Sequence, residues 1–365
     1  MASPEIFLID NAVIWLFICA FEMAMPWLVP TTVQFGVRIP PDKIGSGDVT
    51  LPRRGYVSVQ LVITAATFVP FILLPYLWDM QVFSIAAPFA VLALSFGNYL
   101  RVRNALMEAK RKGNWYEGVR QETFAEIEDG AGPRANYMYA LPALLLLILT
   151  LVLGYTVYPS LPAVLAVHFS VSGVPNGYAP KSSIESFFDA IMQAVTITIM
   201  CVIAAAVVRT RNSIESHIPR TSLVQQNMFK MLAAKTMLLM SFFINISLFM
   251  SQLAIWQILP RSVSVLAAIP AVAGVFGLTI PLARAGQYGS RMKPDTTESQ
   301  TGIANLDDDA EWKVGAAYFN RKDSTILVPK RFGVGWTFNF ANPLSWLILG
   351  SLIAMPLILL LIFRG

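Results

Sequence analysis

Long apolar stretches, separated by shorter polar connections, dominate the chain. Eight of these stretches hold about 20 residues each, the length of helix that crosses the hydrocarbon core of a bilayer, which is about 30 Å thick. They cover residues 7–29, 56–77, 83–100, 137–158, 187–208, 231–253, 263–282 and 344–363. The pattern therefore predicts an all-α integral membrane protein, built as a bundle of eight transmembrane helices.

A second pattern occupies the long connection before the last stretch. Val334, Trp336, Phe338 and Phe340 recur at every second position, which is typical of a strand with one apolar face. The run 325–329 is rich in β-branched and apolar residues, and a turn-forming segment precedes it. We therefore expect a small antiparallel β appendage within residues 283–343. Its aromatic face must pack on the helices, on lipid headgroups or on a partner.

The composition favours a membrane protein over a soluble one. Of the 365 residues, 55% are hydrophobic and only 13% are charged, whereas an average soluble domain has about 25% charged residues. So few charges cannot cover a water-facing surface, which argues against a soluble enzyme and against a disordered protein. Two cysteines and two histidines also argue against a disulfide scaffold and a multi-histidine metal centre.

The basic residues are distributed unevenly along the chain. Of the 27 Lys and Arg residues, 23 lie in the connections 30–55, 101–136, 209–230 and 283–343. Because cytoplasmic loops are enriched in Lys and Arg, these four connections are predicted to face the cytoplasm and both termini to lie outside. The charged run 108–112 is expected to be a solvated helical face. The net charge of +5 thus requires no nucleic-acid partner, and membrane lipids are the expected surroundings.

The predicted spans and loops divide the chain into five consecutive regions. They are a three-span region (1–136), a two-span module with an external loop (137–208), a second two-span region (209–282), the cytoplasmic β appendage (283–343) and a C-terminal span (344–365). The external loop, residues 159–181, is rich in Pro and Gly, and Asn176-Gly177 is a strong turn signal. We expect this loop to be ordered turn without helix.

His168 and Lys181 are the candidate binding groups of the external loop. An unperturbed histidine titrates near pH 6.5, so His168 is a candidate ligand-binding or pH-sensing group, and Lys181 can help to hold an anionic or peptide ligand. The alternative is that His168 hydrogen-bonds its own loop and fixes it. No cysteine or carboxylate cluster accompanies His168 in the sequence, so no zinc site is predicted.

The same loop carries the residues of a known motif. Leu161-Pro162, His168-Phe169, Gly173, Asn176-Gly177-Tyr178 and Lys181 follow one another in this order. This arrangement resembles the signature of the SdpI-like multi-pass membrane proteins, in which Asn, Asp and Trp are usual where Ser170, Asn176 and Tyr178 stand. The runs 35–40 and 312–340 are similar to segments of multi-span relatives. The second run resembles a small uncharacterised domain that is often fused to the SdpI-like module.

The resemblance implies sensing or immunity rather than catalysis. One SdpI-like protein gives bacteria immunity to a secreted killing peptide and is thought to hold a cytoplasmic repressor at the membrane. By this resemblance the ligand is a peptide or a lipid-derived molecule, and its binding residues are His168, Phe169, Gly173, Asn176 and Lys181. The partner is a cytoplasmic regulator or another membrane protein, and its expected contact surface contains Trp312, Lys330, Arg331 and Trp336.

Two charged residues, Glu22 and Lys235, lie inside predicted spans. Charges at that depth are costly, so they pair with each other, snorkel to the interface or line a transport path. The last option makes a secondary transporter or flippase the alternative function, although clear inverted repeats are missing. The patterns Gly-x-Ser-x-Gly and His-Glu-x-x-His are absent from the sequence, so we expect neither an enzyme nor a cofactor.

Overall fold

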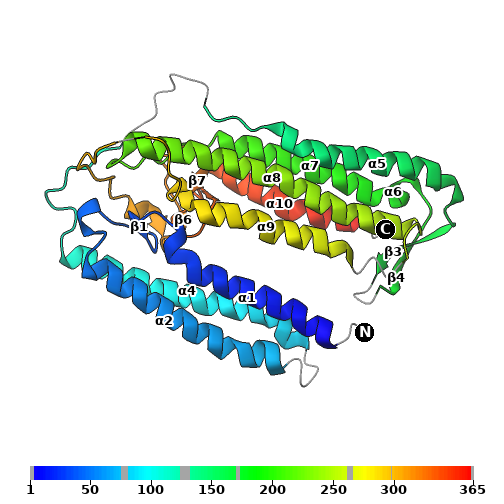
Figure 1. Ribbon diagram of the computed structural model, residues 1–365, viewed down its shortest axis with the longest axis horizontal. Coiled ribbons are helices and arrows are strands. Elements are labelled where there is room, and N and C mark those ends of the chain that lie inside the picture. Colours follow the sequence, from blue (N-terminus) through cyan, green and yellow to red (C-terminus); the bar gives the residue numbers. More distant parts are fainter. Residues whose placement is uncertain are drawn as a thin grey trace. The chain divides into compact units, whose positions relative to one another are not determined.

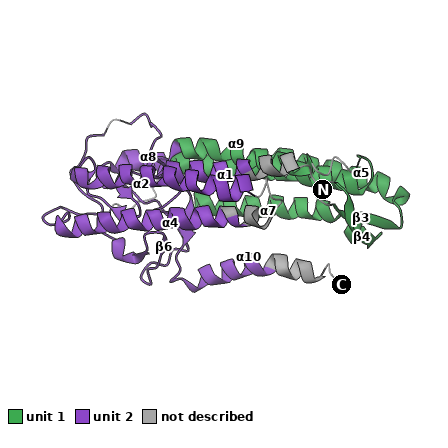
Figure 2. Ribbon diagram, turned by 90° about the horizontal axis from the view of Figure 1, so that it is seen from below, with its two compact units in different colours: residues 1–6, 128–209, 227–284 green, residues 7–127, 210–226, 285–365 purple. Residues whose placement is uncertain are grey.

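Helices make up most of the protein. The structure is a computed structural model that describes residues 4–74, 81–123, 132–169, 173–260, 266–296 and 298–362. The chain forms two compact units (Figures 1 and 2), of which unit 1 holds residues 1–6, 128–209 and 227–284, and unit 2 holds residues 7–127, 210–226 and 285–365. Each unit combines long helices with small antiparallel β elements.

Unit 1 is built on α5 (Leu141–Val157), α7 (Phe188–Val208), most of α8 (Pro219–Ile255) and α9 (Ile269–Ala285). α5 contains no charged residue, so only lipid or other protein segments can cover it. The helical segment begins where the Asn136 side chain accepts a hydrogen bond from the Met138 amide, which satisfies a free N–H group. Small buried residues near that end, Ala140, Ala204 and Ala234, let the helix backbones approach closely.

A β-hairpin follows α5 in unit 1. Strands β3 (Val164–Phe169) and β4 (Pro175–Pro180) pair antiparallel, and α6 (Ser183–Ser186) then leads to α7. The sequence predicts an ordered turn without helix for residues 159–181, but a 3-10 helix covers Tyr158–Ser160 and two strands follow it. The sequence pattern does not anticipate these strands. The reason is that the pairing shifts register on both sides of His168, and such irregularities interrupt the regular period-two alternation that identifies a strand.

Unit 2 contains most of α1 (Pro4–Leu28), together with α2 (Gly47–Phe68), α4 (Gln81–Lys112) and α10 (Pro343–Ile362). α2 continues as a π-helical segment, Val69–Leu73, which contains Pro70; proline lacks the N–H that an α-helix needs. α2 packs against α4, where the Gln60 amide donates to the Ser95 hydroxyl at 2.8 Å. The Asn98 amide also donates to the Tyr56 carbonyl at 3.0 Å. Polar bonds of this kind fix neighbouring helices within a membrane.

Six short strands, paired as three hairpins, complete unit 2. β1 (Val33–Gln34) pairs with β2 (Val37–Arg38), β5 (Trp312–Lys313) with β6 (Ala317–Tyr318), and β7 (Leu327–Pro329) with β8 (Trp336–Phe338). The predicted β appendage is therefore confirmed as antiparallel, but it consists of separate two-stranded pieces. A bridge between Tyr318 and Asn339 links two of them. The fully buried Asn339 side chain also binds the backbone of residues 320, 323 and 341.

The structure supports a multi-pass membrane protein. Within the residues it describes, five helical segments are long and apolar enough to cross a bilayer: Gly47–Leu73, Tyr137–Ser160, Phe188–Val208, Pro219–Ile255 and Leu266–Gly289. The apolar part of α1, Ala12–Leu28, is shorter. Eight transmembrane helices, and termini on the outside, therefore stay predictions from the sequence.

Candidate functional site

The β3–β4 hairpin presents one exposed polar pair. The Nδ1 atom of His168 lies 2.5 Å from the Oδ1 atom of Asn176, and both residues are exposed. Gly177 is the register partner of His168, and a Cβ atom at Gly177 would lie 2.8 Å from the His168 Cβ atom. Glycine therefore leaves the room that His168 needs to turn toward Asn176.

The other three predicted ligand-binding residues hold the hairpin itself. The Lys181 ammonium group donates to the carbonyls of Pro159 (3.3 Å) and Leu161 (3.1 Å), and lies 4.8 Å from the centre of the Tyr158 ring. Phe169 packs on the apolar cluster below the hairpin. Gly173 is buried with φ of +74°, where a side chain is strained. This arrangement favours His168 and Asn176 over these three for contact with a ligand; residues 170–172 of the motif lie outside the described part.

The hairpin stands on a packed aromatic floor at the ends of α5 and α8. Leu165 of β3 is fully buried with Trp256, which follows α8. Trp256 in turn donates its indole N–H to the Ser186 carbonyl at 2.7 Å. The ring centroids of Trp256 and Phe187 lie 5.8 Å apart, with an angle of 71° between the ring planes. A Cβ atom at Gly154 of α5 would lie 2.7 Å from the Trp256 ring. This close packing fixes where the hairpin sits within unit 1.

Unit 2 contains a cluster of paired charges, most of them buried, which we call the ionic cluster. Its members are Arg38, Lys110, Glu215, Asp307, Asp308, Asp309 and Arg331. They come from β2, from the end of α4, and from the connections 210–226 and 285–343. The four connections that the sequence predicts to share one side of the membrane thus contribute to a single body within this unit.

Asp309 is central to the ionic cluster. Its carboxylate accepts hydrogen bonds from Lys110 Nζ at 2.7 Å, from Arg331 Nη1 at 2.5 Å and from the Arg38 backbone N–H at 2.9 Å. Arg331 also pairs with Asp308, and its guanidinium carbon lies 5.0 Å from the centre of the Trp312 ring. Each buried charge therefore has an opposite charge beside it, as burial of an ion requires.

Opposite charges within the cluster shift the pKa values of Asp308 and Arg38. Burial alone would raise the pKa of the Asp308 carboxyl, but the nearby Arg38 and Arg331 guanidinium groups hold it below its ordinary value. Burial alone would lower the pKa of Arg38, but the Asp308 and Glu215 carboxylates raise it. Both groups stay charged at neutral pH, which favours a structural role for this ion pair.

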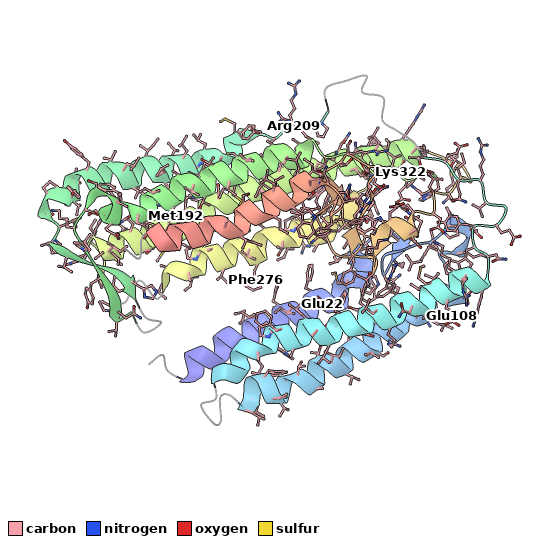
Figure 3. The ribbon with its side chains drawn as sticks, turned by 180° about the vertical axis from the view of Figure 1, so that it is seen from behind. Glu22, Glu108, Met192, Arg209, Phe276 and Lys322 are labelled. Atoms are coloured by element: carbon pink, nitrogen blue, oxygen red, sulfur yellow. The ribbon has the colours of Figure 1, made fainter. Side chains whose placement is uncertain are left out.

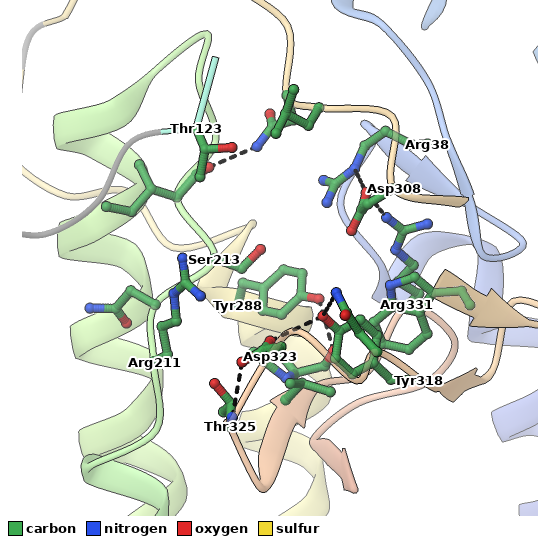
Figure 4. A pocket seen from close by; sticks show the side chains of 18 of the residues that line it. Arg38, Thr123, Arg211, Ser213, Tyr288, Asp308, Tyr318, Asp323, Thr325 and Arg331 are labelled. Carbon is green, nitrogen blue, oxygen red and sulfur yellow. Dashed lines mark hydrogen bonds and ion pairs between the residues drawn. The ribbon is translucent and has the colours of Figure 1, made fainter. Parts of the chain in front are cut away.

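A cavity of about 550 Å³ opens beside the ionic cluster (Figure 4). Its wall includes Arg38, Asp308 and Arg331, together with the exposed basic residues Arg211 and Lys322. On the same wall the Tyr318 hydroxyl donates to the Asp323 carboxylate at 3.0 Å. Burial raises the pKa of Tyr318 to about 12, so its hydroxyl remains a donor. The cavity can accept a polar or anionic group. Within the part of the chain that the structure describes, no three His, Cys, Asp or Glu side chains form a group that could hold a metal ion.

The predicted partner surface divides into buried and accessible residues. Arg331 is 2% exposed and Trp312 is 6% exposed, so both side chains are largely covered within unit 2, although both line the cavity beside the ionic cluster. Lys330 and Trp336 are partly exposed, although the Trp336 indole N–H donates to the Thr210 hydroxyl at 3.1 Å. Lys330 and Trp336 are therefore the more accessible members of the predicted contact surface.

The two predicted intramembrane charges have separate surroundings. Glu22 of α1 (Figure 3) is buried in unit 2, where the Tyr56 hydroxyl donates to its backbone carbonyl at 3.0 Å. Lys235 of α8 belongs to unit 1, where its Nζ atom lies 4.8 Å from the centre of the Tyr139 ring. Each residue has a contact within its own unit, and the structure gives no support for a pair between them.

Sequence reasoning missed Asp189 and the glutamines that lie beside it in unit 1. Asp189 and Gln193 of α7 are buried, as are Asn245 and Gln252 of α8. One signal was present in the sequence: Asn245 and Gln252 are seven residues apart within an apolar stretch, which places them on one helix face.

Comparisons with known proteins match two parts of the chain. Residues 145–193, which include the β3–β4 hairpin, match the model of a domain of unknown function, DUF1648. Residues 321–346, which include β7 and β8, match a family of unknown function, DUF5808. No curated protein matches the chain, and no solved structure matches it. The chain is thus a multi-pass membrane protein that carries two domains of unknown function.

Proposed function

We propose that the protein is a non-enzymatic membrane receptor of SdpI-like type that gives immunity to, or senses, a peptide. The peptide binds in extended form at the β3–β4 hairpin, and the cytoplasmic part of unit 2 passes the signal to a partner. The observation that carries the proposal is the exposed His168–Asn176 pair, held on a hairpin with a free strand edge and a rigid aromatic floor.

The edge of β3 suits an extended peptide. The sheet has two strands, so each strand has one edge to which another strand can add. β4 begins and ends with proline, which has no N–H to donate, whereas β3 contains none. Peptides add to such open edges through main-chain hydrogen bonds. Val164 and Tyr178, which are 57% and 64% exposed, offer apolar contacts beside the polar pair.

Two further features support a receptor on the outer side. The hairpin lies in the connection that the positive-inside pattern predicts to be external, and it falls within the matched residues 145–193. On the predicted cytoplasmic side, the cavity with Arg211 and Lys322 and the exposed parts of Lys330 and Trp336 offer a contact surface for a regulator with acidic side chains.

The test is crosslinked co-purification from native membranes, followed by mass spectrometry of bound peptides, lipids and proteins. We expect a bound peptide with the wild-type protein and its loss with His168→Ala or Asn176→Ala. Ser160→Ala, an exposed hydroxyl change before the hairpin, is the matched control and should keep the peptide. A peptide retained by both hairpin variants contradicts the proposed site, and a lipid-derived molecule in its place contradicts the ligand class.

A secondary transporter or flippase is the second candidate, and buried polar side chains between α7 and α8 favour it. The side-chain amide of Gln193 donates to the backbone carbonyl of Asn245 across these helices at 3.2 Å. Polar groups inside a bundle often mark a substrate path. Flux of a substrate in proteoliposomes that is lost on Gln193→Leu, with no peptide found at the hairpin, would favour transport.

A further inference from the structure

The contact of α7 with α8 leaves several buried polar atoms without partners. Three residue pairs link α8 to α7 and to the end of α6 just before it: Ser186–Gln252, Asp189–Ser251 and Gln193–Asn245. We call these six residues the polar seam. All belong to unit 1, so the seam is a feature of a single compact unit.

The hydrogen bonds in the seam leave several of its side-chain oxygen atoms without a partner. The Gln252 Nε2 atom donates to the Ser186 carbonyl at 3.1 Å, and the Asp189 carboxylate is hydrogen-bonded by the Ser251 side chain. Among the residues described, the seam oxygens left without any partner are Ser186 Oγ, Asp189 Oδ2, Gln193 Oε1, Asn245 Oδ1 and Gln252 Oε1. The unsatisfied atoms are all oxygens, which act as acceptors for a proton or as ligands for a cation.

The unpartnered oxygens of the seam are buried, so bulk water cannot serve as their hydrogen-bond partner. Asp189 is 8% exposed, and Ser186 and Gln252 are 0% exposed, so bulk water does not satisfy them. A buried carboxylate requires a counter-charge. The nearest basic residue in sequence, Lys181, is already bound to the carbonyls of Pro159 and Leu161. Nothing described in unit 1 forms an ion pair with Asp189.

The oxygens near Asp189 do not satisfy one another. The Ser186 hydroxyl can donate as well as accept, yet it forms no hydrogen bond with Asp189 Oδ2 or with Gln252 Oε1. A proton or a cation placed among these atoms would satisfy them. One proton on Asp189 supplies a single donor, whereas an alkali-metal cation supplies the missing positive charge and binds several oxygen atoms at once.

We propose that Ser186, Asp189, Ser251 and Gln252 form a binding site for an alkali-metal cation beneath the β3–β4 hairpin. A carboxylate, hydroxyls and an amide oxygen are the hard donors that such a cation takes in transport proteins. A single positive charge balances the one carboxylate, whereas a divalent ion leaves an uncompensated charge. Trp256 donates to the Ser186 carbonyl at 2.7 Å, so occupancy of this site stiffens the floor on which the hairpin stands.

The test uses the full-length protein in lipid nanodiscs. Thermal unfolding is measured in NaCl, in KCl and in choline chloride at equal ionic strength. We expect a saturable rise in Tm with NaCl or KCl, of about 3 °C when the salt is at about ten times its Kd, and none with choline. Which of the two salts acts at lower concentration identifies the preferred ion.

Variants assign the effect to the site. Asp189→Asn should abolish the salt-dependent rise, whereas Glu185→Gln, the same charge change four residues earlier, should keep it. If Asp189→Asn fails to fold, Ser186→Ala and Gln252→Leu are used, and each should weaken the apparent affinity at least about tenfold. The binding of radioactive sodium to purified wild-type protein and variants gives a readout that does not depend on unfolding.

Three results overturn the proposal. Equal Tm values in all three salts mean that no cation binds. A salt effect that survives Asp189→Asn places the ion elsewhere. A rise in Tm on mild acidification, with no difference among the salts, means that Asp189 is protonated instead. None of these results depends on whether a peptide binds the hairpin, so failure here is distinct from failure of the proposed function.

Discussion

The ionic cluster of unit 2 and the polar seam of unit 1 handle buried polar groups in opposite ways. In the cluster, Arg38, Lys110 and Arg331 each lie within 4.0 Å of a carboxylate oxygen. In the seam, Asp189 has a hydroxyl partner but no cation within the described structure, and amide oxygens around it are unsatisfied. The comparison teaches that the first region balances its buried charges with residues of its own, although the Glu215 oxygens form no hydrogen bond. The second region leaves a buried carboxylate without a counter-charge among the described residues. We therefore assign a structural role to the cluster and a binding role to the seam.

The largest expected effect comes from removing the central carboxylate of the cluster. Asp309→Asn leaves Lys110 and Arg331 without their shared partner, and breaking a buried ion pair from one side costs about 3–5 kcal/mol. We expect a large fall in the unfolding temperature in nanodiscs. Glu311→Gln, two residues away and outside the cluster, is the control and should change little. Equal stability of both variants would contradict the structural role of the cluster.

A neutral residue extends the comparison to uncharged polar groups. Asn339 is fully buried, and its side chain accepts from the Asn320 and Ala341 amides and donates to two carbonyls. Asn339→Ala removes these bonds and should destabilise unit 2 by about 2 kcal/mol. Thr337→Ala in the neighbouring strand β8 serves as the control. Increased proteolysis of residues 320–340 is the second readout, and an unchanged pattern would argue against this role.

The sharpest test compares two identical chemical changes. Asp189→Asn removes an unpaired buried charge, so without alkali-metal ions it should be neutral or stabilising by up to about 1 kcal/mol. Asp309→Asn should destabilise under the same conditions. The measurement is the free energy of unfolding of both variants, relative to wild type, in choline chloride. If Asp189→Asn costs as much as Asp309→Asn, the seam is a structural element like the cluster.

Acidification offers a smaller effect that the cluster should show. The folded-state pKa of Asp308 lies below its unfolded value because Arg38 and Arg331 stabilise the carboxylate more than burial destabilises it. The carboxylate therefore contributes stability at neutral pH, and this is lost as the pH falls from about 4 through the folded pKa. Its partial exposure limits the contribution to below about 1 kcal/mol. Asp308→Asn should flatten the acid limb of the stability curve, and an unchanged limb would contradict the prediction.

The smallest effect is expected on the exposed face of α4. Glu108 and Lys112 form an i,i+4 ion pair at 2.7 Å, with side chains 58% and 69% exposed (Figure 3). The Lys112 ammonium group lowers the pKa of Glu108, but solvent and salt screen such a pair. Glu108→Gln should leave the unfolding temperature unchanged within error, in contrast with Lys110→Met two residues later. A marked loss with Glu108→Gln would mean that another surface covers this face.

The run 108–112 shows where sequence reasoning reached its limit. The sequence predicts a solvated helical face, and this is confirmed for Glu108 and Lys112. It is wrong for Lys110, which is 8% exposed and lies against Asp307 and Asp309. Helical spacing shows which residues share a face, but it does not show what packs on that face. The carboxylates that bury Lys110 come from nearly 200 residues further along the chain.

For the hairpin and the seam too, local sequence and tertiary contacts decided different features. Asn176-Gly177 is a strong turn signal in the sequence, but the structure places both residues within strand β4, so the turn prediction is wrong at these residues. That His168 meets Asn176 while Lys181 holds the loop base depends on the strand register and on the register shifts at His168. The seam was missed because Asp189 and Gln252 are far apart in sequence, and each alone is an ordinary polar residue near a helix end.

The sequence by itself determined that the protein is a helical, multi-pass membrane protein with a small antiparallel β appendage. Apolar length and period-two alternation are local properties, and the cost of exposing apolar groups to water makes them decisive. Only the tertiary structure decided which polar groups are buried and whether each has a partner. Those partners come from segments remote in the chain, and the free energy of a buried charge depends on them rather than on its sequence neighbours.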